Sequence, residues 1–89
     1  MLRISSATEA GAVVTLKVEG ALVRDWVPLL EAECQCRLDT GKSVELDFCC
    51  VSFIDRDGVA MVCGLFAKGI RVVGASALVN ALLGRSCAP

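Results

Sequence analysis

The chain has 89 residues, of which 55% are hydrophobic and 21% are charged, and its formal net charge is -1. This length fits one domain spanning residues 1–89, and the near-zero charge supplies no basic field for nucleic acid or an anionic membrane. The charge therefore favours protein partners over nucleic acid. No apolar run approaches the ~20 residues of a membrane span, so we also expect no membrane insertion.

The N-terminal part of the sequence predicts a β-hairpin. Apolar and polar residues alternate over 12–19, which is typical of a half-buried strand. We expect residues 2–4 to form a shorter strand before it, and a turn at 9–11 can join the two. Gly20 ends the second strand.

The next segment predicts an amphipathic helix. Asp25 can cap it, and its first turn accepts Pro28 because the amide that proline lacks would have had no partner there. Gly41 stops the helix. Its inward face holds apolar residues at helical spacing, namely Val27, Leu30, Cys34 and Leu38.

The second half of the chain repeats the alternation of strand and helix. Residues 44–51 predict a strand, a helix runs from the Asp55 loop to about Lys68, and a short strand covers 70–73. Ser76 can cap a last helix through about residue 83. The expected fold is α/β with the order β-β-α-β-α-β-α, a small mixed sheet of about four strands packed with about three helices.

The second of these helices is apolar on both sides. One side, which we expect to pack on the sheet, holds Val59, Val62, Cys63 and Phe66. The opposite side is also apolar and holds Ala60, Met61, Gly64 and Leu65. A helix that is apolar all round needs cover on both sides, either from another element of the chain or from a partner, and we favour a partner.

The loop before this helix carries the most specific motif. Residues 44–59 read Val-Glu-Leu-Asp-Phe-Cys-Cys-Val-Ser-Phe-Ile-Asp-Arg-Asp-Gly-Val. This stretch resembles the signature of the STAS (sulfate transporter and anti-sigma factor antagonist) family, in which a strand leads through Phe-Ile-Asp-x-x-Gly into a helix. Segments 16–22 and 72–76 match the second and fourth strands of the family. The resemblance covers 13 to about 83 and implies a STAS-like fold.

The resemblance also implies a role. It points to a non-catalytic, cytoplasmic, anti-sigma factor antagonist-like module of bacterial signalling and transcription regulation, which binds a protein partner such as an anti-sigma factor or kinase. The loop and the outer side of the second helix would form the docking surface. The partner-binding residues that this implies are Asp55, Arg56, Asp57, Gly58, Met61 and Leu65.

The position of the family's phosphoacceptor is altered in this sequence. Antagonists of the family carry a Ser or Thr directly before the glycine, and a partner kinase phosphorylates it. Here that position is Asp57, preceded by Arg56. A serine/threonine kinase cannot phosphorylate an aspartate, so we expect the phospho-switch to be absent.

The same residues also have purely structural interpretations. Asp55 can serve only as the helix cap, which we favour for this residue, and Asp57 can serve only to complement the helix dipole. Gly58 can serve only to allow close packing beside the loop. For Arg56 and Asp57 the structural and the recognition roles are about equally supported, because charged loop residues between apolar elements are well placed for recognition.

A second branch of the family leaves the partner open. STAS-like proteins also act as accessory subunits of a lipid-transport ABC system, with a transporter ATPase as partner, or bind a small ligand.

The predicted domain is short at its C-terminus, where many relatives continue with a further strand and helix. Exposed apolar surface near the last strand would then favour a homodimer.

The residues argue against an enzyme and against a metal site. The sequence has no His and no Tyr, so the commonest general base is missing. Three acids, Asp47, Asp55 and Asp57, could be compared with the magnesium site of a receiver domain. That site also needs an acidic pair after the first strand and a lysine on a late strand, and the sequence has neither. The six cysteines are expected to be reduced and to form a thiol-rich interior, except Cys87, which we expect to be exposed and oxidisable. Cys49 and Cys50 are expected on opposite faces of a strand. We expect no cofactor and no metal.

Overall fold

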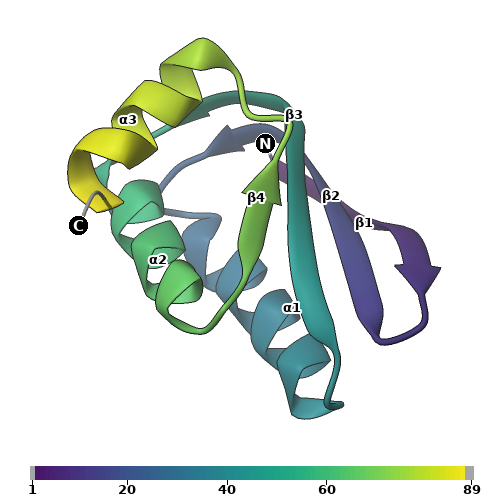
Figure 1. Ribbon diagram of the computed structural model, residues 1–89. Helices are drawn as coiled ribbons and strands as arrows, with labels where there is room; N and C mark the ends of the chain where they lie inside the picture. The colour runs from purple at the N-terminus through teal and green to yellow at the C-terminus, as the bar shows by residue number, and fades with distance from the viewer. Residues whose placement is uncertain (1, 88–89) are drawn as a thin grey trace.

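The computed structural model describes residues 2–87 and contains four strands and three helices over that range (Figure 1). In chain order the elements are β1 (Leu2–Ala10), β2 (Val13–Leu22), α1 (Val27–Asp39), β3 (Ser43–Ile54), α2 (Arg56–Ala67), β4 (Arg71–Val73) and α3 (Ala77–Cys87). The predicted order β-β-α-β-α-β-α is confirmed.

The four strands form one mixed sheet in the order β1-β2-β3-β4. β1 and β2 are an antiparallel hairpin, whereas β2, β3 and β4 are parallel to one another, with α1 and α2 as the crossover connections. The glycine of the hairpin turn, Gly11, has φ of 60°, which a residue with a Cβ adopts at a cost. The sheet brings the carboxyl ends of β2 and β3 together, and the loops at these ends build the site described below.

The core lies between the sheet and the helices. On the covered face of the sheet, Val14 pairs with Val44 and Leu16 pairs with Leu46, and all four side chains are buried. Leu30 and Cys34 of α1 are also fully buried, which confirms the predicted inward face of that helix. α1 and α2 lie side by side, and α3 crosses the end of α2 and the last part of β3 (Figure 1).

Two irregularities interrupt the pairing of β3 with β2. Between the pairs Lys17–Asp47 and Glu19–Cys50, β3 has one residue more than β2, and a second register shift follows before Phe53. Each extra residue in a strand reverses the alternation of its side chains. The burial of β3 therefore stops alternating after Phe48, and Cys49 and Cys50 are both exposed.

Several details differ from the prediction. Asp25 does not cap α1, because the cap position is occupied by Trp26, which makes no side-chain hydrogen bond there, although Pro28 does lie in the first turn as expected. β1 is longer than the predicted 2–4 because the whole segment up to the turn pairs with β2. The predicted cap of α3 is confirmed, since the Val79 amide donates to Ser76 Oγ at 3.2 Å.

The expectation of a thiol-rich interior is wrong for most of the cysteines that the structure describes. Cys34 is the buried free thiol, whereas Cys36, Cys49 and Cys50 are free and exposed. Cys63 is half-buried and disulfide-bonded rather than reduced.

Within residues 2–87, none of the helices has both the length and the apolar character needed to cross a membrane.

Candidate functional site

Asp55 fixes the start of α2. Its backbone is extended and its Oδ1 accepts a hydrogen bond from the Gly58 amide at 2.8 Å, so it is the N-cap that the sequence predicted. Its second oxygen, Oδ2, accepts from the Arg24 amide in the β2–α1 loop, also at 2.8 Å. One carboxylate therefore ties two loops together, and both of its oxygens are engaged inside the chain.

Gly58 lets the start of α2 approach the end of β2. A Cβ at this position would lie 2.6 Å from the Leu22 backbone oxygen and 2.8 Å from Ile54 Cγ1. Only glycine fits such a contact, since carbon and oxygen atoms cannot approach this closely without a shift of the backbone. Gly58 is buried, and its close contacts with Leu22 and Ile54 account for a glycine at this position.

Arg56 and Asp57 occupy the first turn of α2 and are exposed. In the part of the chain that the structure describes, neither side chain forms a hydrogen bond or an ion pair. Their charges are therefore available to an external group. The anchoring of Asp55 and Gly58 on either side holds the backbone that carries them in place.

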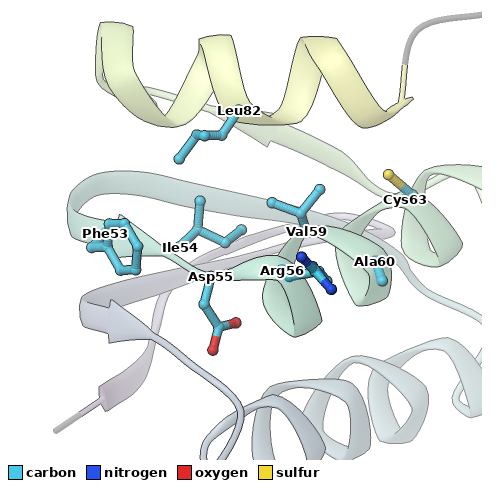
Figure 2. Close-up of a pocket in the computed structure, with 8 residues that line it drawn as sticks. All are labelled: Phe53, Ile54, Asp55, Arg56, Val59, Ala60, Cys63 and Leu82. Carbon is cyan, nitrogen blue, oxygen red and sulfur yellow. The ribbon is translucent and has the colours of Figure 1, made fainter.

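A pocket of about 730 Å³ lies at the start of α2, and Arg56, though not Asp57, is part of its lining. Figure 2 shows it between α3, which contributes Leu82, and the end of β3 with the first turns of α2. The lining is mostly apolar, and Leu82 points across the pocket toward β3 and α2, whereas the Asp55 carboxylate points the other way (Figure 2). The residues that line the pocket are Phe53, Ile54, Asp55, Arg56, Val59, Ala60, Cys63 and Leu82.

The expectation that Met61 and Leu65 are exposed on the outer side of α2 is wrong. Their side chains are only 7% and 2% exposed, and both belong to the core. The reason is that α2 contacts α1 on one flank and α3 on the other. Met61, Leu65 and Lys68 follow one another at helical spacing, and Lys68 Nζ donates to Gln35 Oε1 of α1 at 2.9 Å. This line of α2 therefore faces α1.

The outer side of α2 carries smaller residues than the sequence suggested. Ala60 and Gly64 are exposed as predicted, and Phe66, which was assigned to the sheet side, is 37% exposed. The first two turns thus present Arg56, Asp57 and Ala60 to solvent.

Two residues of the site were not found from the sequence. Phe53 is 46% exposed at the pocket rim because the second register shift in β3 turns it outward, and Leu82 reaches the pocket from α3. The two register shifts of β3 cancel by Phe53, so uninterrupted alternation would also have turned it outward, but no local pattern showed that a pocket forms beside it. The docking of α3 on α2 is a tertiary contact that periodicity does not reveal.

The site offers binding groups rather than reactive pairs. It combines an open guanidinium, an open carboxylate, an exposed aromatic ring and an apolar pocket. Among residues 2–5 and 11–84, whose side chains the structure describes, no group of three or more Cys, Asp or Glu is placed to hold a metal ion. Such a surface is suited to recognising another molecule.

Neither a protein-family model nor a curated protein sequence matches the chain. Solved structures do match. The anti-sigma factor antagonist SpoIIAA in its unphosphorylated form superimposes with a TM-score of 0.74 at 22% identity, covering 94% of this chain and 80% of that one. The Bacillus cell fate determinant SpoIIAA in its phosphorylated form gives a TM-score of 0.69 at 21% identity, covering 94% and 83%. An antisigma-factor antagonist STAS domain from Rhodobacter sphaeroides gives a TM-score of 0.64 at 21% identity, covering 85% of this chain and 92% of that one. The chain therefore has the STAS fold.

Proposed function

We propose that the chain is a non-catalytic protein-docking module of the anti-sigma factor antagonist type. The structures that it resembles are antagonists of this kind, one of them determined in phosphorylated and unphosphorylated forms. The docking surface consists of Phe53, Arg56, Asp57 and Ala60, with Asp55 and Gly58 holding it in shape. Met61 and Leu65 contribute to it only as the packed base of α2.

The observation that carries the proposal is the open charge pair at the start of α2. Arg56 and Asp57 are exposed and make no hydrogen bond or ion pair with the groups that the structure describes, and Phe53, which is 46% exposed, lines the same pocket as Arg56. A partly exposed aromatic ring beside charged groups on a rigid backbone is typical of protein interfaces. The surface is small, so the partner must contact neighbouring elements as well.

The regulation of this module differs from a phospho-switch. Asp57 stands where antagonists of the family carry the phosphorylated hydroxyl, and it holds one permanent negative charge at the helix N-terminus. A phosphate would add nearly two charges and three acceptor oxygens. The module is therefore expected to stay in one binding state unless its partner is regulated.

The direct test measures binding to a candidate anti-sigma factor kinase by isothermal titration calorimetry. Ala60→Glu introduces a charge on the outer side of α2 and should weaken binding by at least tenfold. Ala32→Glu, at an exposed alanine of α1, is the matched control and should bind as the original chain does. Equal affinities for both variants would contradict the proposed surface.

A kinase assay tests the proposed regulation separately. The original chain should take up no phosphate at residue 57, whereas Asp57→Ser restores a hydroxyl and should be phosphorylated by a kinase that recognises this fold. Phosphate on the original chain at another residue of the loop would show that the switch has moved rather than disappeared.

The pocket favours a second candidate function, the binding of a small ligand. A volume of about 730 Å³ with an apolar lining lies within the range of ligand sites. Leu82→Trp would fill it from α3. A ligand that raises the melting temperature of the original chain but not of this variant would support the second function, and an unchanged affinity of the variant for the kinase would separate the two.

A further inference from the structure

Two free thiols lie together on the surface at the first irregularity of β3. Cys49 Sγ and Cys50 Sγ are 3.5 Å apart, and both residues are exposed. Adjacent residues of a regular strand point to opposite faces, which is what the sequence predicted for this pair. The prediction is wrong because β3 has an extra residue between its pairings with Lys17 and Glu19.

The backbone around the pair is held in place from two sides. The Cys49 amide donates to Asp47 Oδ1 at 3.0 Å, which fixes the bend just before the two cysteines. Gly74, after β4, packs against the same point, since a Cβ there would lie 3.0 Å from Asp47 Oδ1 and 3.3 Å from Cys49 Cβ. The two sulfur atoms are therefore presented by a constrained bulge rather than by a loose loop.

The separation of the sulfur atoms limits which centre could bridge them. With metal–sulfur bonds of about 2.3 Å, a sulfur–sulfur distance of 3.5 Å corresponds to an S–M–S angle of about 100°. A linear two-coordinate ion would need the sulfur atoms about 4.6 Å apart. A tetrahedral structural ion would need further protein ligands, and among the side chains that the structure describes no group of three or more Cys, Asp or Glu is placed to hold a metal ion. A pyramidal centre that takes only two ligands from the protein fits both limits.

We propose that Cys49 and Cys50 form a bidentate site for a thiophilic, pyramidal centre, of which trivalent arsenic is the representative case. This site is separate from the docking surface on α2 and does not depend on the proposed function. The third ligand of the arsenic comes from outside the protein. Soft centres of this kind prefer thiolate sulfur to the oxygen ligands nearby.

The reaction with an arsenical needs no oxidant or reductant. With hydrated phenylarsine oxide, each thiol proton passes to a hydroxyl group on the arsenic, two As–O bonds break, two As–S bonds form and two water molecules leave. Arsenic remains trivalent and both sulfur atoms keep their oxidation state. The product is one phenylarsenic group bridging the two cysteines.

The test uses phenylarsine oxide on the full chain, followed by intact-protein mass spectrometry, titration and a count of reactive thiols. The original chain should bind one phenylarsenic group tightly and lose two reactive thiols. Cys49→Ala and Cys50→Ala should each weaken binding on the order of 100-fold or more, because a single sulfur lacks the gain of the second, intramolecular bond. Cys36→Ala, at an exposed single thiol of α1, is the matched control and should bind like the original chain.

Each outcome decides the proposal. Tight binding that persists in either the Cys49→Ala or the Cys50→Ala variant would overturn it, and so would an original chain that binds no phenylarsenic group. Both cysteines are exposed, so the two variants should remain folded, and circular dichroism spectra matching that of Cys36→Ala would verify this. Serine variants at the same two positions serve if an alanine variant does not fold.

Discussion

Asp55 joins two segments of the chain through one carboxylate. Its Oδ1 caps α2 by accepting a hydrogen bond from the Gly58 amide, three residues along the chain. Its Oδ2 accepts from the Arg24 amide, which lies 31 residues away in sequence. Removal of this side chain therefore removes a local and a long-range hydrogen bond together.

The double role of Asp55 predicts a stability difference between two neighbouring aspartates. Asp55→Ala removes the hydrogen bonds to the Gly58 and Arg24 amides and should lower the free energy of unfolding by about 2 kcal/mol. Asp57→Ala removes only a favourable charge at the helix N-terminus and should cost at most about 0.5 kcal/mol. Urea denaturation of both variants measures the difference, and equal losses would contradict the assigned roles.

The two roles of Asp55 also show how much of the site the sequence predicts. The helix cap was predicted because an N-cap is a local arrangement within four residues. The bond to the Arg24 amide joins residues 31 apart in sequence, and no local pattern contains that information. Phe53 and Leu82 were missed for the same reason, because their pocket forms only where α3 packs beside the end of β3.

Cys34 predicts a dependence of stability on alkaline pH. Burial, assisted by the negative charge of Glu33, raises the pKa of its thiol from 9.0 to about 11. The folded chain therefore holds this proton more tightly than the unfolded chain, so the contribution is complete below pH 9 and is lost as the pH rises toward 11. We expect a loss of about 1–2 kcal/mol over that window.

Denaturation at pH 8 and pH 10.5 checks this expectation against a Cys34→Ala variant. The variant is less stable at both pH values because it leaves a small cavity, but its stability should fall less between them. Parallel pH profiles for the two proteins would show that the thiol does not contribute.

At the scale of elements, the sequence predicted the existence and order of all seven helices and strands. Three patterns predicted their elements correctly: the hydrophobic alternation over β2, the same alternation over the first part of β3, and the helical spacing in α1. Each of these elements buries one face, and burial of one face produces such a pattern. The predicted outer side of α2 was wrong because the helix has three neighbours, namely the sheet, α1 and α3. A helix that is apolar all round does not reveal which of its sides faces solvent. The bulges of β3 were missed for a similar reason, since its apolar residues continue through them.

The glycines of α2 provide a matched pair of predictions. Gly58→Ala places a Cβ 2.6 Å from the Leu22 backbone oxygen and should destabilise the chain by about 1–3 kcal/mol. Gly64→Ala, in the same helix, meets nothing within 4 Å and should stabilise it by about 0.5–1 kcal/mol. Thermal unfolding of the two variants should therefore shift the melting temperature in opposite directions.

At the scale of the whole molecule, the apolar surface around β4 and α3 bears on self-association. Val73 at the end of β4 is 38% exposed and Leu78 in the first turn of α3 is 54% exposed. β4 is also an edge strand, with β3 as its pairing partner in the sheet. Apolar residues beside a free strand edge favour contact with a second copy.

We therefore predict that the chain forms homodimers at high concentration through this region. Leu78→Glu should shift the equilibrium toward the monomer, whereas Leu29→Glu, at a comparably exposed leucine of α1, should leave it unchanged. Size-exclusion chromatography with light scattering distinguishes the two states. A monomer at all concentrations, or an equal effect of both variants, would contradict the prediction.

The bridge made by Asp55 also has a consequence for solvent exchange. The Arg24 and Gly58 amide protons both point at one carboxylate, although Arg24 lies in the β2–α1 loop and Gly58 lies in the first turn of α2. Opening of either segment must disturb the acceptor that the other shares, so the two protons should exchange with deuterium at similar, slow rates. A surface turn between β2 and α1 would then show the protection of an interior segment, and Asp55→Ala should accelerate the exchange of both amides together.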